Sequence, residues 1–271
     1  MGLLSAHRLL ITGLALIVPA LIPILADGAK AAPQYTWPGA GDHASGSLKD
    51  RIAPPDGYER VPVEAGSFAE WLRNLPVRPE QTLIHLYDGR LRATQDRHVA
   101  VIDIDTGKRN LQQCADAIMR LRAEYLLSAG KARDIAFNYT DGKRVRYRGN
   151  TRDRKAFRRY MTGVFAYAGT YSLERELRKV DLRDIRIGDV FIKGGFPGHA
   201  MIVADMAQQK QTGEKRFLLI QSFMPAQDMH VVKVPGFWNN TSPWYEIPAS
   251  DGELITPDWI FPPKTLHRFA D

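Results

Sequence analysis

The spacing of apolar residues changes along the chain from helical to strand-like. Apolar positions recur every three or four residues over 110–126 and 153–168, which predicts two amphipathic helices. After residue 184, short apolar runs are separated by Gly, Pro and polar turns, at 190–192, 200–204, 217–221 and 230–234. Such runs predict an antiparallel meander rather than βαβ crossovers.

The helix predicted over 110–126 carries Cys114, the only cysteine of the chain, in its first turn. Asn110 suits the N-cap position, and Gln113, three residues later, suits a capping box. Unpaired N–H groups and the positive end of the helix dipole favour a thiolate there, so we expect a lowered thiol pKa. The alternative interpretation is a small apolar side chain packed at a helix end.

The first residues of the chain predict export. An apolar run over 9–26 is followed by Ala29-Lys30-Ala31, a small-x-small pattern typical of signal-peptide cleavage. A retained membrane anchor is the alternative, but the flanks of the run are not those of a stop-transfer segment. We therefore expect a periplasmic or secreted protein with no integral membrane segment in the mature chain. Its expected parts are a signal peptide (1–31), a flexible linker (32–50) and a single catalytic domain (51–271).

Export changes the interpretation of the lone cysteine. Structural cysteines in an oxidising compartment normally come in pairs, so a single one suggests a reactive thiol or an intermolecular bridge. The formal net charge of +7 indicates acidic partners, here wall polymers or a membrane surface rather than nucleic acid. A basic segment over 143–159 contains the candidate substrate-binding residues Arg152, Arg154 and Arg158, with a merely solvated surface as the alternative.

A thiol nucleophile needs a base, and the base needs a polar side chain that orients it. His199 is the candidate base because it follows a glycine-rich loop, 194–198, and opens a predicted strand. Gln221, at the end of the next predicted strand, is the candidate third residue, and His230 is the alternative. The histidines lack close ligand spacing, so we expect no metal and no other cofactor.

Three sequence features carry a resemblance to a known superfamily. Cys114 at a helix start is followed by Gly188-Asp189-Val190-Phe191-Ile192 and by Gly198-His199-Ala200-Met201-Ile202-Val203. This order resembles the core of the NlpC-type cysteine peptidases, a papain-like superfamily of bacterial wall hydrolases. Longer strings, such as Gln221-Ser222-Phe223-Met224-Pro225-Ala226-Gln227, resemble a secreted bacterial family known as a domain of unknown function, over about 51–269.

The resemblance implies an α+β, papain-like or NlpC-type fold. A cysteine-bearing helix would pack on an antiparallel β-sheet, with extra helices inserted between Cys and His. Cys114 would be the nucleophile, His199 the general base and Gln221 the third residue. The N–H of Cys114 and the Gln113 side chain would stabilise the oxyanion. Three departures from the common pattern stand out. Gln113 replaces an Asp that often precedes the Cys, a large helical insertion separates Cys114 from His199, and the third residue is an amide where a His is frequent.

The expected function is hydrolysis of an amide bond in peptidoglycan or a related cell-envelope peptide, through an acyl-thioester on Cys114. Two alternatives remain open. One is a thiol acyltransferase or transpeptidase, which passes the acyl group to an amine or lipid. The other is a catalytically silent module that holds an acidic wall polymer through its basic segment.

Overall fold

The computed structural model describes most of the chain, in the ranges 1–2, 34–42, 44–79, 83–236 and 242–270. The expected signal peptide lies almost entirely outside the described residues. The chain from Ala31 to Asp271 forms one compact unit. Among the described residues, none of the helices combines the length and the apolar character that a bilayer crossing requires.

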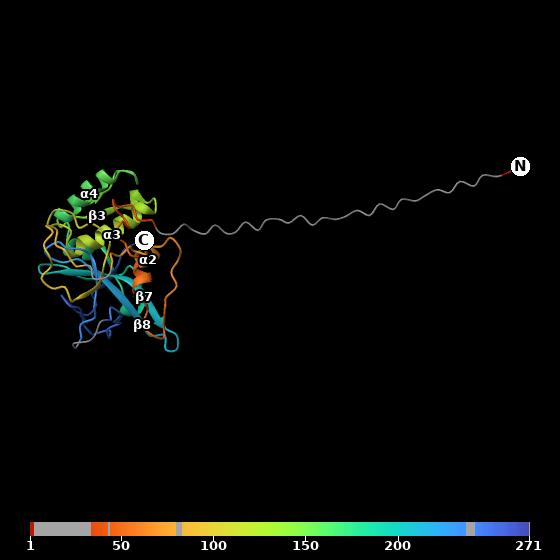
Figure 1. Cartoon of the computed structure of the whole chain (residues 1–271). Coiled ribbons are helices and arrows are strands. Elements are labelled where there is room, and N and C mark those ends of the chain that lie inside the picture. The colour runs from red at the N-terminus through yellow and green to blue at the C-terminus, as the bar shows by residue number, and fades with distance from the viewer. Residues whose placement is uncertain (3–33, 43, 80–82, 237–241, 271) are drawn as a thin grey trace. The chain divides into compact units, whose positions relative to one another are not determined.

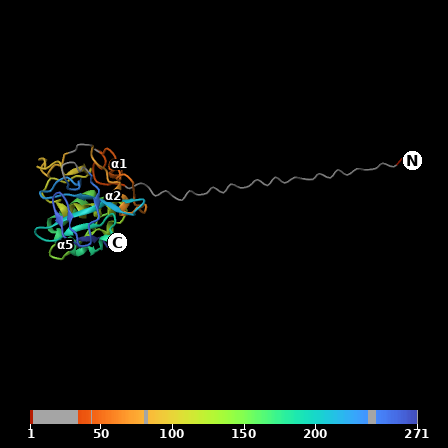
Figure 2. The ribbon, with the colours of Figure 1, turned by 90° about the horizontal axis from the view of Figure 1, so that it is seen from below.

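An antiparallel sheet of nine strands forms the centre of the domain (Figures 1 and 2). Its main path, in spatial order, is β2 (His98–Val101), β9 (His230–Val232), β8 (Lys215–Gln221), β7 (His199–Gln209), β6 (Val190–Lys193), β13 (Leu266–Arg268) and β5 (Arg178–Lys179). Off this path, β1 (Tyr58–Arg60) pairs with β7, and β10 (Tyr245–Glu246) pairs with β8. Strands β6 to β9 follow one another in sequence and pair antiparallel, which confirms the predicted meander.

Helices cover one side of this sheet, and the C-terminal segments cover the other (Figure 1). The described α-helices are α1 (Leu48–Arg51), α2 (Phe68–Arg73), α3 (Cys114–Ser128), α4 (Arg154–Tyr167) and α5 (Thr170–Glu176). Two hairpins stand apart from the sheet, β3 (Ala136–Asn138) with β4 (Arg144–Arg146) and β11 (Leu254–Ile255) with β12 (Ile260–Phe261). The α+β expectation is confirmed. In the sequence, α4 and α5 follow the cysteine helix and precede the strand that begins at His199.

Strand β7 is buried on both faces over 200–204, which explains the unbroken apolar sequence of that part. Alternate residues of a strand point to opposite faces of the sheet. Ala200 and Ile202 belong to the core cluster that contains the apolar residues of α3. Met201 and Val203 belong to a second cluster, which includes Phe261 of the C-terminal segment. The cysteine helix and the C-terminal segment are therefore held on opposite faces of the same strand.

The expected flexible linker over 32–50 is wrong for the residues that the structure describes there. Trp37 is 3% exposed, and its Nε1 donates to the carbonyl of Asp103 over 2.9 Å. Leu48, the first residue of α1, is fully buried. These two apolar side chains are too few to form a periodic pattern, yet each finds a place in the core. The folded domain therefore begins before residue 51.

Candidate active site

Helix α3 begins at Cys114, three residues later than the start that an N-cap at Asn110 predicts. Gln113 takes the N-cap position, and its N–H donates to Asp116 Oδ2 over 3.0 Å. The Asn110 side chain instead accepts a hydrogen bond from the N–H of Ala226, 2.8 Å away. As the first helical residue, Cys114 has an N–H without an acceptor inside the helix. The thiol and a free N–H donor therefore occupy the same helix end.

The thiol is buried, and its pKa moves in the direction opposite to the prediction. Cys114 is 6% exposed, and burial raises the pKa of its thiol to about 11, with a further contribution from the Asp116 carboxyl. Backbone N–H groups at Ala115, Ala200 and Cys114 itself act the other way but are outweighed. The helix end does favour a thiolate, but removal of water from the thiol has the larger effect. The Cys114 thiol is therefore neutral near pH 7.

His199 and Gln221 are joined directly, as predicted. Nε2 of the imidazole lies 2.8 Å from Oε1 of the amide. The ring is 1% exposed and sits among three aromatic side chains, with ring-centroid distances of 4.9 Å to Phe223, 5.6 Å to Trp259 and 5.8 Å to Phe261. Burial lowers the pKa of His199 to about 4, against the opposing effects of Gln221 and Asp258. The imidazole is therefore neutral near pH 7.

The thiol lies beside the first residues of β7. The N–H of Ala200, the residue after His199, is one of the groups that lower the pKa of Cys114. Among the described residues, no hydrogen bond joins the Cys114 thiol to the His199 ring. In sites without substrate such bonds are often long and tighten only in the complex. The structure thus places the thiol beside the start of β7 and joins His199 directly to Gln221, while the His199 ring packs with Phe261, which belongs to the cluster on the opposite face of β7 from α3.

His230 lies behind Gln221 rather than against His199. Nε2 of Gln221 is 3.1 Å from Nε2 of His230 and 2.7 Å from Oδ2 of Asp258. Gln221 is therefore the side chain in the third position, and His230 supports it. Asp258 was missed by the sequence argument, because it stands in a segment rich in Pro and Trp whose composition indicates only packing.

The two glutamines before Cys114 have different surroundings. Gln113 is partly exposed, and its Nε2 donates to Asn110 Oδ1 over 3.2 Å. Gln112 is 1% exposed, and its Oε1 accepts from Nη1 of Arg120 over 2.9 Å. Gln113 thus remains the side-chain candidate for an oxyanion donor, next to the N–H of Cys114. Among the described residues, no three His, Cys, Asp or Glu side chains are grouped as metal ligands.

Two of the three predicted substrate-binding arginines are held in ion pairs behind the cysteine helix. Arg154 donates to both oxygens of the fully buried Glu124, each over 2.7 Å. Arg158 lies 2.8 Å from Asp105. Arg120, buried within α3, links these acids through bonds of 2.8 Å to Glu124 and 3.1 Å to Asp105. Arg152, the third candidate, is exposed.

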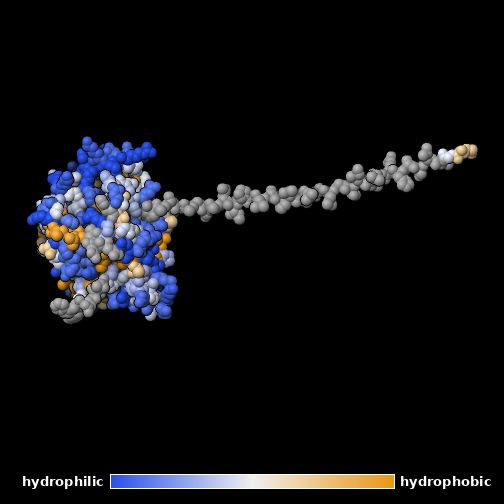
Figure 3. All heavy atoms as spheres, viewed as in Figure 1, coloured by the Kyte–Doolittle hydropathy of each residue, from blue (hydrophilic) through white to orange (hydrophobic). Residues whose placement is uncertain are grey.

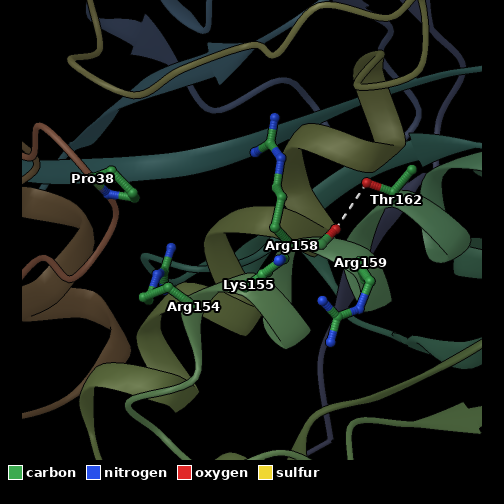
Figure 4. A pocket seen from close by; sticks show the side chains of 6 residues that line it. All are labelled: Pro38, Arg154, Lys155, Arg158, Arg159 and Thr162. Atoms are coloured by element: carbon green, nitrogen blue, oxygen red, sulfur yellow. Dashed lines mark hydrogen bonds between the residues drawn. The ribbon is translucent and has the colours of Figure 1, made fainter.

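A basic cavity of about 570 Å³ opens along α4 (Figure 4). It is lined by Pro38, Arg154, Lys155, Arg158, Arg159 and Thr162. Lys155 and Arg159 have no acidic partner among the described residues. Nη1 of Arg158 is buried there without a hydrogen-bond partner. The surface over α4 is hydrophilic (Figure 3), and this cavity is a candidate site for anions.

Comparison with known proteins identifies one family. A family model described as "Domain of unknown function (4846)" matches residues 48–151 and 148–268. These ranges cover most of the chain, so the chain belongs to this family. No curated protein matches the chain. No solved structure matches it either.

Proposed function

We propose that this family member is an exported cysteine hydrolase of the papain-like, NlpC-type class, which cleaves an amide bond in peptidoglycan or a related envelope peptide. One observation carries the proposal. A neutral His199, bonded through Nε2 to the Gln221 amide over 2.8 Å, opens the strand against which the Cys114 thiol lies at a helix start. A thiol, a base and a group that orients the base are the parts that acyl transfer requires.

The neutral thiol and the neutral imidazole define the order of proton transfers. His199 accepts the thiol proton as the sulfur attacks the carbonyl carbon, and the Cys114 N–H and the Gln113 side chain donate to the oxyanion. The carbon–nitrogen bond then breaks, and the imidazolium gives its proton to the leaving amine. Water, deprotonated by His199, attacks the thioester and releases a carboxylic acid and the free thiol. Acylation of the thiol and hydrolysis of the thioester each end with His199 neutral again.

The basic cavity on α4 supports an acidic substrate. Lys155 and Arg159 supply positive charge that no acid in the described chain neutralises. Carboxylates of a wall peptide or phosphates of an attached polymer would be held there by charge-assisted hydrogen bonds. Arg154 and Arg158, predicted as the main contacts, line the cavity but are already paired.

A catalytically silent wall-binding module is the second candidate, and one observation favours it. The thiol is 6% exposed, and its pKa is raised to about 11, a setting in which many structural cysteines are inert. This candidate keeps the anion site on α4 and assigns Cys114 to packing.

Digestion of purified wall sacculi tests the proposal. The mature wild-type protein should release new peptide fragments with free amine ends, identified by mass, and Cys114→Ser should release none while retaining the same melting temperature. Fragments joined to an added amine would indicate acyl transfer instead of hydrolysis. Release of no fragment by wild-type protein that still binds sacculi would support the silent module and contradict the proposed hydrolysis.

A further inference from the structure

The Gln221 carboxamide lies between His199 on one side and Asp258 and His230 on the other. Its Oε1 lies 2.8 Å from His199 Nε2, whereas its Nε2 lies 2.7 Å from Asp258 Oδ2 and 3.1 Å from His230 Nε2. Gln221 is 1% exposed, and His230 is fully buried. An amide has one accepting end and one donating end, so its partners decide which way it faces.

Asp258 identifies the donating end. A carboxylate only accepts hydrogen bonds, so the amide atom that faces it is the nitrogen. Arg92 and Arg97 both donate to the other carboxylate oxygen, Oδ1, over 2.7 Å and 2.8 Å. Burial raises the pKa of Asp258, but the hydrogen bonds from these arginines outweigh it and hold the pKa below its usual value. Asp258 therefore stays ionised, with Oδ2 left for Gln221.

His230 favours the same orientation. Its Nδ1 lies 2.9 Å from the carbonyl oxygen of Asp228, so Nδ1 carries the hydrogen. Its Nε2 then accepts, which agrees with Nη1 of Arg92 at 3.4 Å, since a guanidinium only donates. Two neighbours of Gln221 thus require its nitrogen on their side and its oxygen toward His199.

We propose that Asp258 is a positioning residue that selects the tautomer of His199, a role that rests on the proposed function. Because Oε1 of Gln221 can only accept a hydrogen bond, Nε2 of His199 carries the hydrogen and donates it to Oε1. Nδ1 is then the only ring nitrogen able to accept the thiol proton of Cys114. Asp258 acts through Gln221 and keeps Nδ1 free of hydrogen, so that it can accept a proton.

Asp258→Asn tests the role because asparagine has a single side-chain oxygen. The two arginines hold that oxygen, so the asparagine NH₂ turns toward Gln221. Gln221 then presents Oε1 to the asparagine and its own NH₂ to His199, and Nε2 of His230, which now faces Oε1, must take up a hydrogen. The imidazole must accept at Nε2, and its hydrogen moves to Nδ1, where it blocks proton transfer from the thiol.

Long-range ¹H–¹⁵N NMR of the imidazole reads the tautomer without turnover, in protein that carries Cys114→Ala. We expect the Nε2–H form with Asp258 in place and a shift to the Nδ1–H form in Asp258→Asn. Asp205→Asn is the matched control, because Asp205, like Asp258, is a carboxylate held by two arginines, Arg60 at 2.7 Å and Arg73 at 2.6 Å. It should leave the tautomer unchanged.

Two further variants keep the test decisive. If Asp258→Asn does not fold, Asp258→Ala replaces it, since alanine no longer accepts from the Gln221 amide; we expect a partial shift in the same direction. Asp258→Glu, which keeps a carboxylate, should retain the Nε2–H form. An unchanged tautomer in folded Asp258→Asn, or in Asp258→Ala where the first does not fold, overturns the inference.

Turnover separates this inference from the proposed function. In protein with Cys114 intact, Asp258→Asn should lower kcat by on the order of 10²-fold or more with little change in KM, because general-base catalysis is lost. If wild-type protein releases no wall fragments while the tautomer responds, the proposed hydrolysis fails and the positioning of His199 stands. If walls are digested and the tautomer ignores Asp258, the inference alone fails.

Discussion

At the scale of single residues, Cys114 and His199 form a neutral pair. Burial moves the two pKa values apart, to about 11 and about 4. A pre-formed thiolate–imidazolium pair would need the reverse order, with the imidazole more basic than the thiol. In the proposed hydrolysis the thiolate would therefore form during the reaction, by proton transfer to His199 as the sulfur attacks. The tautomer of His199 would then be a requirement for activity.

The raised pKa predicts slow alkylation of Cys114 in the folded protein. The reactive form is the thiolate, and a pKa raised from its ordinary value to about 11 lowers the thiolate fraction at every pH below that value. Labelling by iodoacetamide should be slow at pH 7 and rise about tenfold per pH unit up to about pH 11. The urea-unfolded chain, as control, should label with an ordinary cysteine pKa of about 8.5. Fast labelling of the folded protein at pH 6 would contradict this prediction.

At the scale of elements, buried charges fix the cysteine helix against α4. Glu124 in α3 accepts from Arg120 of the same helix and from Arg154 of α4. Arg120 also holds Gln112, two residues before the thiol. The network therefore connects the packing of α4 to the backbone that enters the active site.

Glu124→Ala should destabilise the fold by about 3–5 kcal/mol, because it removes the buried carboxylate that Arg120 and Arg154 share and leaves their positive charges less well matched. The matched control is Glu246→Ala, which breaks the exposed pair with Arg216 at 2.8 Å and should cost about 1 kcal/mol or less. Urea denaturation of both variants measures the difference. Equal losses of unfolding free energy would mean that the network does not stabilise α3 against α4.

Strand periodicity and helix spacing were sufficient to predict β6 to β9, α3 and α4, because short apolar runs between turns mark the strands and the two helices are long. The start of α3 was misplaced, since Asn110 caps nothing and instead binds Ala226, more than a hundred residues away. His199 and Gln221 were predictable from neighbouring strands. Asp258 was not, because a contact made by irregular chain leaves no periodic signal. The direction of the Cys114 pKa shift also depends on burial, which the local sequence does not determine.

At the scale of the whole molecule, the net charge of +7 is a poor guide to where anions bind. Many basic side chains of the segment 143–159 are surface groups, and Arg144, Arg154 and Arg158 are paired with acids. The cavity on α4 instead collects in one place two cations, Lys155 and Arg159, that have no acidic partner in the part of the chain that the structure describes.

Charge reversal at this cavity should weaken binding to acidic wall polymer. We expect Lys155→Glu with Arg159→Glu to reduce affinity and to flatten its dependence on salt, since fewer charges remain to be screened. The control, Lys143→Glu with Arg148→Glu, changes the same net charge at exposed positions outside the cavity and should have a smaller effect. Sedimentation with sacculi at increasing salt measures both. Equal effects of the two pairs would indicate that net charge, and not this cavity, drives binding.

The acyl-thioester on Cys114 is the central claim, and mass spectrometry of the acid-quenched reaction tests it most directly. During turnover of wall fragments, wild-type protein should gain the mass of an acyl group on the peptide that contains Cys114. Neutral hydroxylamine should remove this mass, and His199→Ala should not acquire it. Release of wall fragments without any adduct on Cys114, or undiminished release by Cys114→Ala, would contradict the account.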